Sequence, residues 1–213
     1  MEVTNLITVD NREIKHDFEI AQMKYPGLEY RYEGRSGYCH VVEGEIDIVD
    51  GTGTLWGSFE VSIRFYHTYP KGFALPYDKS RAFKWINDWH MNSDGECCVC
   101  SPLEKIEQSY TRTTIIEFIE GYVIPFYSNQ VHRRIYGKYK NGAYNHGLEG
   151  IWESLEEEFN TRDREKIKLI LEEMNHTRTR NDPCICGGAH KYKKCHMNRI
   201  KYIREMVRKN DIM

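Results

Sequence analysis

Residues 89–102 read W-H-M-N-S-D-G-E-C-C-V-C-S-P, a polar turn that runs into three cysteines. Three thiols this close together, with no His or Cys spacing around them that suits a metal, make a candidate nucleophile. A thiol attacks only as its thiolate, so the residues around it decide whether it reacts. The alternative is that these cysteines are small apolar residues of a buried turn, because Cys is among the most buried residue types.

This tract resembles the active-site loop of ubiquitin-conjugating enzymes, in which a His, an Asn and a glycine turn precede an apolar residue, the thioester-forming Cys and a Leu. Those places would be taken, in that order, by His90, Asn92, Gly95, Cys97, Cys98 and Val99. The resemblance therefore makes Cys98 the nucleophile. Alternation along an extended segment would then point Cys97 and Cys100 away from the face that carries Cys98.

Both flanks of the tract extend the resemblance. Tyr69-Pro70 followed by Pro76 is similar to the YP-x-x-x-P turn of that fold, and residues 98–102 are similar to the C-L-x-x-P continuation of prokaryotic members. One spacing departs from the family, whose Asn usually lies eight residues before the nucleophile. Here Asn92 lies six residues before Cys98 and His90 lies eight before it, so either residue is a candidate to hold the oxyanion.

The pattern of apolar residues predicts an α+β fold. Residues 11–25 have helical spacing, and Thr114 and Glu117 fit a capping box at the start of a later helix that Pro125 must kink or end. Alternating stretches predict an antiparallel β-meander over residues 28–32, 38–49 and 55–65, with a hairpin signal at residues 50–53 and room for one more short strand at residues 82–85. Further helices are expected over residues 148–159 and 162–174.

This order of N-terminal helix, β-meander, active-site loop and C-terminal helices resembles that of the ubiquitin-conjugating fold. The resemblance covers roughly the first 160 residues by motif and element order. Within it, residues 145–150 look like an H-G-x-x-G segment of some bacterial relatives. His146 in that segment would act on the incoming amine or on thioester geometry, or else it is hydrogen-bonded to backbone at a helix start.

The C-terminal tail has the spacing C-x-C-x8-C-H, with Cys184, Cys186, Cys195 and His196 as the four candidate ligands. Four such ligands, two at each end of a turn that contains Gly-Gly, complete the tetrahedral shell of a structural Zn²⁺ and leave no position open for water. The tail has no core of its own, so metal binding would supply much of its folding free energy. It resembles the SEC-C motif, and we expect a small zinc knuckle.

The charge is distributed unevenly. Ten Lys and Arg against three Asp and Glu from residue 177 onward give the tail a net charge of +7, which leaves −9 for the rest of a chain whose net charge is −2. The tail is therefore expected to contact an acidic protein surface or, less well supported because it has few aromatic residues, nucleic acid. We expect three segments: a ubiquitin-conjugating-like catalytic domain at 1–160, a helical linker at 161–176 and the zinc-binding tail at 177–213.

Composition places the chain among ordinary globular proteins, with 40% hydrophobic and 29% charged residues. No stretch approaches the roughly 18 uninterrupted apolar residues of a membrane span, and residues 1–20 are unlike a signal or transit peptide. The seven cysteines lie in two tight clusters plus Cys39, which is typical of a reducing cytoplasm. We therefore expect a cytoplasmic protein without a membrane partner.

The resemblance implies an enzyme that carries a ubiquitin-like protein, or another protein C-terminus, as a thioester on Cys98 and transfers it to an amine. There is no Gly-rich phosphate loop, so activation would come from an activating enzyme as partner, or the protein tail would arrive already activated. Relatives of this kind imply a role in bacterial antiphage defence, in a CBASS-type operon with a cyclic-oligonucleotide synthase as target or in a ubiquitin-like conjugation operon.

Two other functions remain open. One is a catalytically inactive domain of the same fold that docks a ubiquitin-like or client protein, with the zinc tail as a second docking site. The other is a regulator that binds nucleic acid through Lys191, Lys193 and Lys194, whose affinity would fall steeply with salt.

Overall fold

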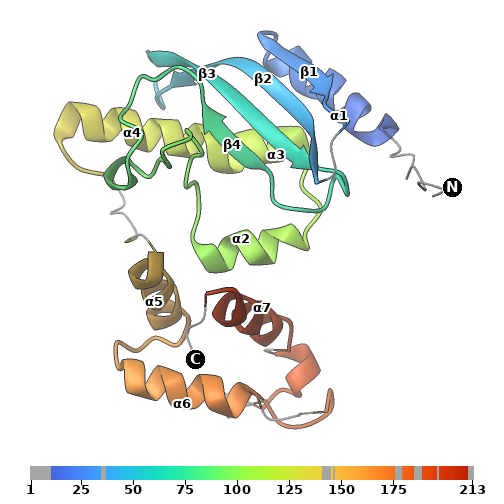
Figure 1. Cartoon of the computed structure of the whole chain (residues 1–213), viewed down its shortest axis with the longest axis vertical. Coiled ribbons are helices and arrows are strands. Elements are labelled where there is room, and N and C mark those ends of the chain that lie inside the picture. Colours follow the sequence, from blue (N-terminus) through green and yellow to red (C-terminus); the bar gives the residue numbers. More distant parts are fainter. Residues whose placement is uncertain are drawn as a thin grey trace, which may run out of the picture. The chain divides into compact units, whose positions relative to one another are not determined.

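The computed structural model of the chain describes residues 11–34, 37–140, 145, 147–175, 179–184, 189–195 and 197–210. These residues form two compact units (Figure 1). Unit 1 runs to Val99 and continues from Gln108 to residue 140, whereas unit 2 consists of Cys100–Glu107 and the described residues from 145 onward. The helices before and after residues 160 and 176, where we expected segment boundaries, share one hydrophobic core.

Unit 1 begins with the predicted amphipathic helix, α1, which spans Arg12–Lys24. Ile14 and Ala21 are buried, while the charged side chains of the same helix remain exposed or half-buried. The helix ends at Tyr25, and a turn follows at Pro26 and Gly27, where proline cannot continue the helical hydrogen bonds.

A four-stranded antiparallel meander follows, with the strand order β1-β2-β3-β4. The strands are β1 (Leu28–Tyr32), β2 (Tyr38–Val49), β3 (Leu55–Tyr66) and β4 (Leu75–Asp78). The three strands predicted from alternation are confirmed. In the turn between β2 and β3, the Asp50 carboxylate accepts the backbone N–H groups of Thr52 at 2.8 Å and Thr54 at 3.0 Å, which explains the strength of the hairpin signal.

The helix that begins at Thr114 is divided into three parts. The predicted capping box is present at the start of α3 (Ile115–Phe118), where Thr114 and Glu117 exchange side-chain and backbone hydrogen bonds. A π-helical segment, Ile119–Val123, leads into α4 (Ile124–Tyr136). The ring of Pro125 in a regular α-helix would clash with the carbonyl group four residues earlier, and the wider π turn makes room for it.

The core of unit 1 lies between the sheet and these helices (Figure 1). On the covered face, Phe59 stacks on Tyr127 of α4 with ring centroids 4.7 Å apart, and Phe65 meets Phe118 of α3 edge-on at 5.9 Å. Aromatic pairs in these geometries add to the stabilisation from burial alone. The meander and α4 are thereby fixed to each other, and both contact the cysteine loop.

The short strand that we expected at residues 82–85 is not formed, since these residues have no strand pairing. Their apolar alternation has another cause, which is aromatic packing. Phe83 stacks on Phe59 at 5.3 Å, and the Trp85 indole N–H donates to Asp78 at 2.8 Å. The fourth strand is β4, which can contain Pro76 because it lies at the edge of the sheet.

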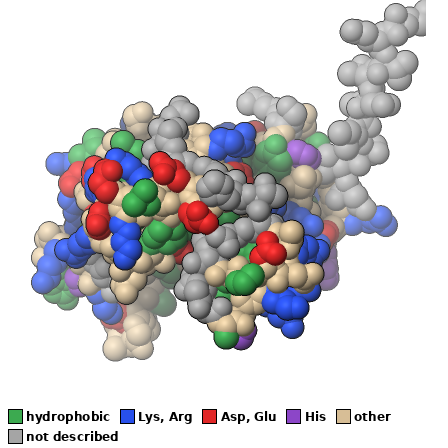
Figure 2. All heavy atoms as spheres, turned by 90° about the horizontal axis from the view of Figure 1, so that it is seen from below, with side chains coloured by type: hydrophobic (Ala, Val, Ile, Leu, Met, Phe, Trp, Pro, Cys, Tyr) green, Lys and Arg blue, Asp and Glu red, His purple; other side chains and the backbone are tan. Residues whose placement is uncertain are grey.

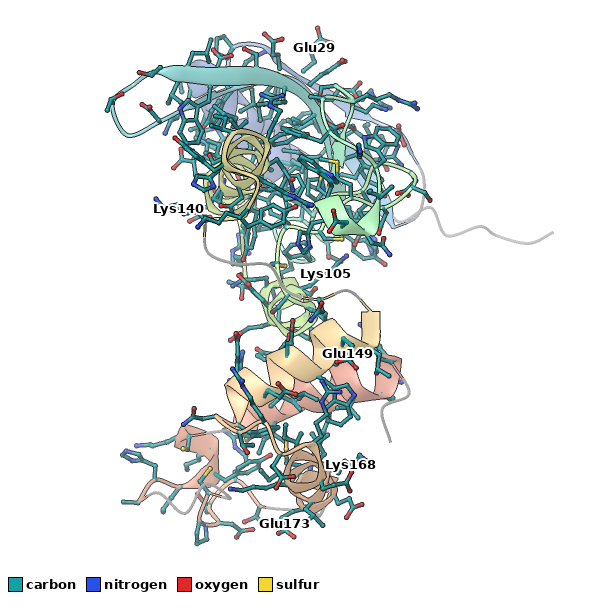
Figure 3. All side chains as sticks on the ribbon, turned by 90° about the vertical axis from the view of Figure 1, so that its left-hand side faces the viewer. Glu29, Lys105, Lys140, Glu149, Lys168 and Glu173 are labelled. Carbon is teal, nitrogen blue, oxygen red and sulfur yellow. The ribbon has the colours of Figure 1, made fainter. Side chains whose placement is uncertain are left out.

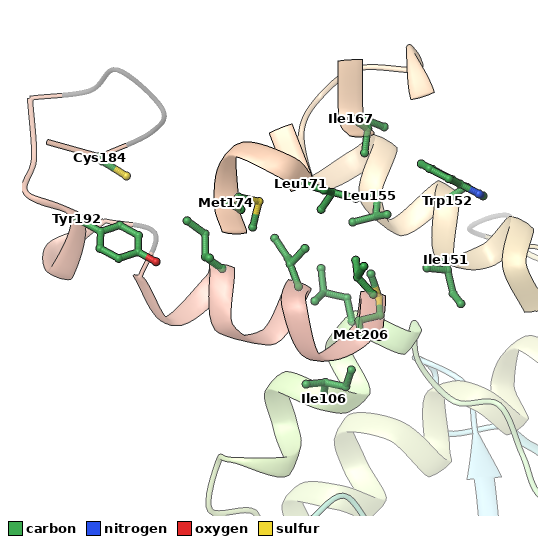
Figure 4. Packing of buried hydrophobic residues seen from close by; sticks show 14 residues of the cluster. Ile106, Ile151, Trp152, Leu155, Ile167, Leu171, Met174, Cys184, Tyr192 and Met206 are labelled. Carbon is green, nitrogen blue, oxygen red and sulfur yellow. The ribbon is translucent and has the colours of Figure 1, made fainter. Parts of the chain in front are cut away.

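Unit 2 is helical. It contains most of α2 (Pro102–Ser109), together with α5 (Gly147–Glu158), α6 (Arg164–Asn175), the short 3-10 helix η3 (Tyr192–Lys194) and α7 (Met197–Lys209). Figure 3 marks α5 by Glu149 and α6 by Lys168 and Glu173. The helices enclose a single core (Figure 4), and its buried residues are Leu103, Ile106, Ile151, Trp152, Leu155, Ile167, Leu171, Met174, Cys184, Tyr192, Ile200, Ile203, Met206 and Val207.

Ion pairs surround this core. Arg199 of α7 pairs with Glu107 of α2 and with Glu158 of α5, the latter at 2.6 Å. Arg164 of α6 pairs with Glu149 at 2.6 Å and Glu156 at 2.9 Å on α5. Partly exposed ion pairs contribute little stability each. The apolar core therefore provides most of the folding free energy of unit 2.

No helix within the described ranges is long and apolar enough to cross a bilayer. The face drawn in Figure 2 shows Lys and Arg side chains interspersed with Asp and Glu.

Candidate functional site

The cysteine loop of unit 1 is a small hairpin, which we call the thiol hairpin (residues 90–98). Met91 pairs with Cys97 as an isolated antiparallel bridge, the Cys98 N–H donates to the His90 carbonyl at 2.8 Å, and the Asn92 N–H donates to the Glu96 carbonyl at 2.8 Å. This register sets His90 opposite Cys98 and Asn92 opposite Glu96. The residue that lies eight positions before Cys98 is therefore its direct neighbour across the hairpin.

The two faces of the thiol hairpin differ in exposure. Met91 and Cys97 are buried, with 0% and 3% exposed, whereas His90 and Cys98 are half-buried and Asn92 is exposed. Neighbouring residues of an extended segment point to opposite faces, so the burial of Cys97 accompanies the partial exposure of Cys98. The burial expected for both flanking cysteines holds for Cys97 only. Cys100 is half-buried like Cys98, because residues two positions apart in an extended segment share a face, so alternation gave no reason to bury Cys100.

Cys97 is chemically unsuited to act as a nucleophile. Burial, followed by the nearby Asp78 carboxylate, raises the pKa of the Cys97 thiol well above its ordinary value. Its sulfur lies 3.7 Å from the Gly95 carbonyl oxygen. At neutral pH this thiol therefore stays protonated, and it serves as a packing residue on the buried face of the hairpin.

Asp78 anchors the buried face of the hairpin to its surroundings. This fully buried carboxylate accepts the Tyr127 hydroxyl at 3.0 Å, the Trp85 indole N–H at 2.8 Å and the Ser80 hydroxyl at 2.6 Å. Its backbone N–H donates to the Gly95 carbonyl at 2.9 Å. Tyr127 of α4 and two residues of the loop after β4 thus meet at one side chain, and their hydrogen bonds satisfy this buried polar group.

Gly95 is required by the geometry of the turn. Its φ is +90°, and a Cβ at this position would lie 2.9 Å from the Trp85 ring and 3.0 Å from the Asp78 carbonyl oxygen. The turn closes through the Gly95 N–H, which donates to the Asn92 carbonyl at 2.9 Å. The glycine in the sequence pattern thus reflects both a left-handed backbone and a close approach.

A polar network from α4 holds the entry to the hairpin. The short 3-10 helix η1 (Asn87–Trp89) precedes His90, and its Trp89 carbonyl accepts the Gln130 side-chain N–H at 3.0 Å. Arg133 donates to the carbonyl and carboxylate of Asp88. The ring of Tyr139 meets the ring of His90 edge-on, with centroids 5.2 Å apart. Sequence reasoning missed this network, and the only signal was the abundance of Tyr after residue 133.

The predicted catalytic residues are placed as follows. His90 and Cys98 are neighbours in the thiol hairpin, and Asn92 lies two positions nearer its tip, opposite Glu96. His146 lies outside the described residues.

The tail of unit 2 contains a second hairpin, which we call the tail hairpin (residues 179–184 and 190–195). Pro183 bridges to Lys191, the Tyr192 N–H donates to the Asp182 carbonyl at 2.8 Å, and the Lys193 N–H donates to the Arg180 carbonyl at 3.0 Å. Tyr192 is buried in the core of unit 2. The tail hairpin is thus attached to the helical core through this side chain and through Cys184.

Two of the four predicted metal ligands belong to the described part of this hairpin. Cys184 is 4% exposed, and Cys195, which follows η3, is exposed. Cys186 and His196 lie outside the described residues. The Pro183–Lys191 bridge brings the chain back beside Cys184, and Cys195 follows four residues after the bridge. Among the described residues alone, no group of three or more potential ligands gathers.

Comparison with known proteins identifies one segment. The family model described as the SEC-C motif matches residues 180–198, which include the tail hairpin from Arg180 and all four predicted ligands. No curated protein and no solved structure matches the chain. The SEC-C motif is therefore present in the tail, while unit 1 is described by its own geometry.

Proposed function

We propose that this chain is a ubiquitin-conjugating-like transferase that uses Cys98 as its acyl carrier. The observation that supports this most is the difference in burial between the two adjacent thiols of the thiol hairpin. Cys97 is buried with a raised pKa, while Cys98 lies on the half-open face, paired through its backbone with His90. The meander followed by this hairpin and by α3 and α4 also agrees with the element order of the ubiquitin-conjugating fold.

The proposed chemistry consists of two acyl transfers. The Cys98 thiolate attacks the carbonyl carbon of an activated protein C-terminus, such as a thioester on an activating enzyme, and the partner's thiolate leaves. An amine, such as a lysine side chain, then attacks the new thioester. It loses its proton to a base, and Cys98 leaves as thiolate while an amide forms.

Each tetrahedral intermediate carries an oxyanion that needs donors. The register favours His90 for this role, because its backbone pairs directly with that of Cys98. Asn92 lies opposite Glu96 and further along the hairpin, so we assign it to contacts with the incoming protein near the tip. His146 keeps its proposed role beside the incoming amine.

The partners follow from this chemistry. The chain has no Gly-rich phosphate loop, so activation comes from a separate enzyme that supplies a ubiquitin-like protein or another protein tail. We propose a role in bacterial antiphage defence, with a cyclic-oligonucleotide synthase as one candidate target. The basic tail would dock on an acidic protein surface.

We further propose that Cys184, Cys186, Cys195 and His196 bind a structural Zn²⁺. When bound, the ion would crosslink the two ends of the loop and supply folding free energy to the tail. The chain's own contribution is the tail hairpin, whose Tyr192 and Cys184 reach the helical core.

The test is intact-mass spectrometry after incubation with two acyl donors. One is ubiquitin carrying a C-terminal mercaptoethanesulfonate thioester, and the other is a glycine-terminated peptide thioester, which needs no protein recognition. We expect the wild type to form an adduct that thiol reductant removes. In Cys98→Ser the adduct should be absent, or present as an oxyester that reductant does not remove. The control Cys100→Ser should form the same adduct as the wild type. No adduct on Cys98 with either donor would overturn the transferase proposal and favour a docking domain of the same fold.

A further inference from the structure

The 3-10 helix η1 ends with backbone carbonyls that need hydrogen-bond donors, and α4 supplies them. Gln130, which is 1% exposed, donates its amide N–H to the Trp89 carbonyl at 3.0 Å. Arg133 donates to the Asp88 carbonyl and carboxylate, and its guanidinium lies 4.3 Å from the centroid of the Trp89 ring. These two side chains fix the segment from which His90 emerges.

Tyr139 links these side chains to each other. Gly137, in a left-handed conformation, ends α4 and turns the chain back toward the helix. The Tyr139 hydroxyl accepts from Arg133 at 3.0 Å and donates to the Gln130 side-chain oxygen at 3.2 Å. Its ring meets the His90 ring edge-on at 5.2 Å. One tyrosine thus touches both donors and the residue that they hold.

His90 needs such support because of its backbone. Its φ of 50° lies in the left-handed region, which a residue with a Cβ adopts at an energetic cost. The same residue provides the carbonyl that accepts the Cys98 N–H at 2.8 Å. The strained conformation therefore determines where the backbone of Cys98 lies.

We propose that Gln130, Arg133 and Tyr139 form a positioning network that holds His90 in its left-handed conformation and thereby aligns Cys98 for acyl transfer. The catalytic part of this inference rests on the proposed function. The three residues act through His90 and Cys98 and are not catalytic residues themselves. Tyr139 is the specific element, because it joins the network to the His90 ring.

The first experiment does not depend on acyl transfer. Amide hydrogen exchange of Cys98, measured by NMR on the full-length protein, reports the hydrogen bond to His90. Tyr139→Ala and Arg133→Gln should each accelerate this exchange by about tenfold, since the hydrogen bond between Cys98 and His90 loses its support. The control Tyr136→Ala removes an exposed tyrosine from α4 and should leave the exchange unchanged.

The second experiment separates alignment from substrate binding. With the ubiquitin thioester as donor, Tyr139→Ala should lower kcat about tenfold with little change in KM, because Tyr139 is proposed to act through His90 and not on the donor. Tyr139→Phe keeps the ring against His90 and should restore part of the lost kcat. A variant that had only lost global stability would not show this split or this rescue at a temperature where all variants are folded.

The outcomes are distinguishable. If Cys98 exchange and kcat stay at wild-type levels in Tyr139→Ala and Arg133→Gln, the positioning network is wrong even though the transferase proposal stands. If the wild type transfers no acyl group while the exchange responds as expected, the network holds Cys98 as inferred and only the proposed function fails.

Discussion

The chain presents cysteines from two hairpins that are stabilised in different ways. The thiol hairpin of unit 1 is fixed by protein groups alone, with β4 and the buried Asp78 on one side and α4 on the other. The tail hairpin of unit 2 reaches its core mainly through Tyr192 and Cys184. We expect the contacts of the thiol hairpin to hold Cys98 in place for the proposed chemistry, and the tail hairpin to gain stability from the proposed metal.

The two hairpins also use neighbouring cysteines differently. In the thiol hairpin, Cys97 is buried and its neighbour Cys98 is half-buried, and burial raises the pKa of the Cys97 thiol. In the tail, the pattern C-x-C followed by C-H would direct all four groups toward one ion. Spacing alone does not distinguish these cases, but burial and backbone pairing do.

The largest effect that separates the two hairpins should come from the nucleophile. Cys98→Ala should lower acyl transfer by roughly a thousandfold or more, because it removes the proposed acyl carrier. The matched change in the tail, Cys195→Ala, should leave the rate of single-turnover transfer within a few-fold of wild type. Transfer kinetics from a peptide thioester measure the rates of both variants. Equal losses of rate in the two variants would show that the two hairpins do not differ in their role in acyl transfer.

Metal removal should act on the other hairpin. A chelator that strips Zn²⁺, or Cys184→Ser, should destabilise unit 2 by more than about 4 kcal/mol, since the ion binds only the folded tail. Exchange protection of α7 reports this loss, while the protection of β2 and β3 in unit 1 should remain. Retained protection of α7 without metal would mean that the core around Tyr192 is sufficient by itself.

Gly95→Ala tests how rigid the thiol hairpin is. The new Cβ meets the Trp85 ring and the Asp78 carbonyl oxygen at a residue with φ of +90°, so we expect a loss of about 2 to 4 kcal/mol. The matched control is Gly53→Ala, with φ of +83° and open space around the Cβ, which should cost about 1 to 2 kcal/mol from backbone strain alone. Urea unfolding of both variants gives the comparison, and equal losses would show that crowding at Gly95 is relieved.

The smallest expected effect concerns the pH dependence of unit 1. Burial lowers the pKa of His40, which is 1% exposed and bonded to the Tyr30 hydroxyl at 3.0 Å. Above the pKa of an unfolded His, about 6.5, both states are neutral and stability is unaffected by this group. As the pH falls below that value the unfolded chain takes up a proton first, so stability should drop, by up to about 1 kcal/mol.

Urea midpoints at pH 7.5 and 5.5 measure this loss. His40→Gln should reduce the pH dependence, whereas substitution of the exposed His16 should not. A drop of the same size in His40→Gln would assign the effect to other groups.

Much of unit 1 could be predicted from local chemistry. The turn at Asp50 and the capping box at Thr114 were predictable because their side chains bond to backbone a few residues away. The ends of β1 and β2 follow from alternation bounded by glycine and proline. The strand expected near Phe83 was wrong, because aromatic packing and strand pairing produce the same apolar alternation.

Features that depend on long-range contacts were not predictable. Apolar residues in α7, such as Ile200, Ile203 and Val207, have helical spacing, but the excess of basic residues obscured it. The role of Asp78 depends on Tyr127, which is distant in sequence. The role of Tyr139 depends on Gln130, which it meets because the chain reverses direction after α4. The sequence therefore identified candidate thiols and ligands, while the structure showed what holds the described ones.

The π-helical segment between α3 and α4 contains one residue more than an α-helical turn would. The Ile124 N–H reaches the Ile119 carbonyl, one residue further back than in an α-helix. Deleting one residue inside this segment would restore an α-helix and leave the later side chains on nearly the same face, because the wide turn already absorbs the extra residue. Deleting one residue of α4 between Pro125 and Gln130 would instead rotate Gln130 and Arg133 by about 100° about the helix axis, away from η1. The alignment of Cys98 should therefore tolerate the first deletion and be lost with the second.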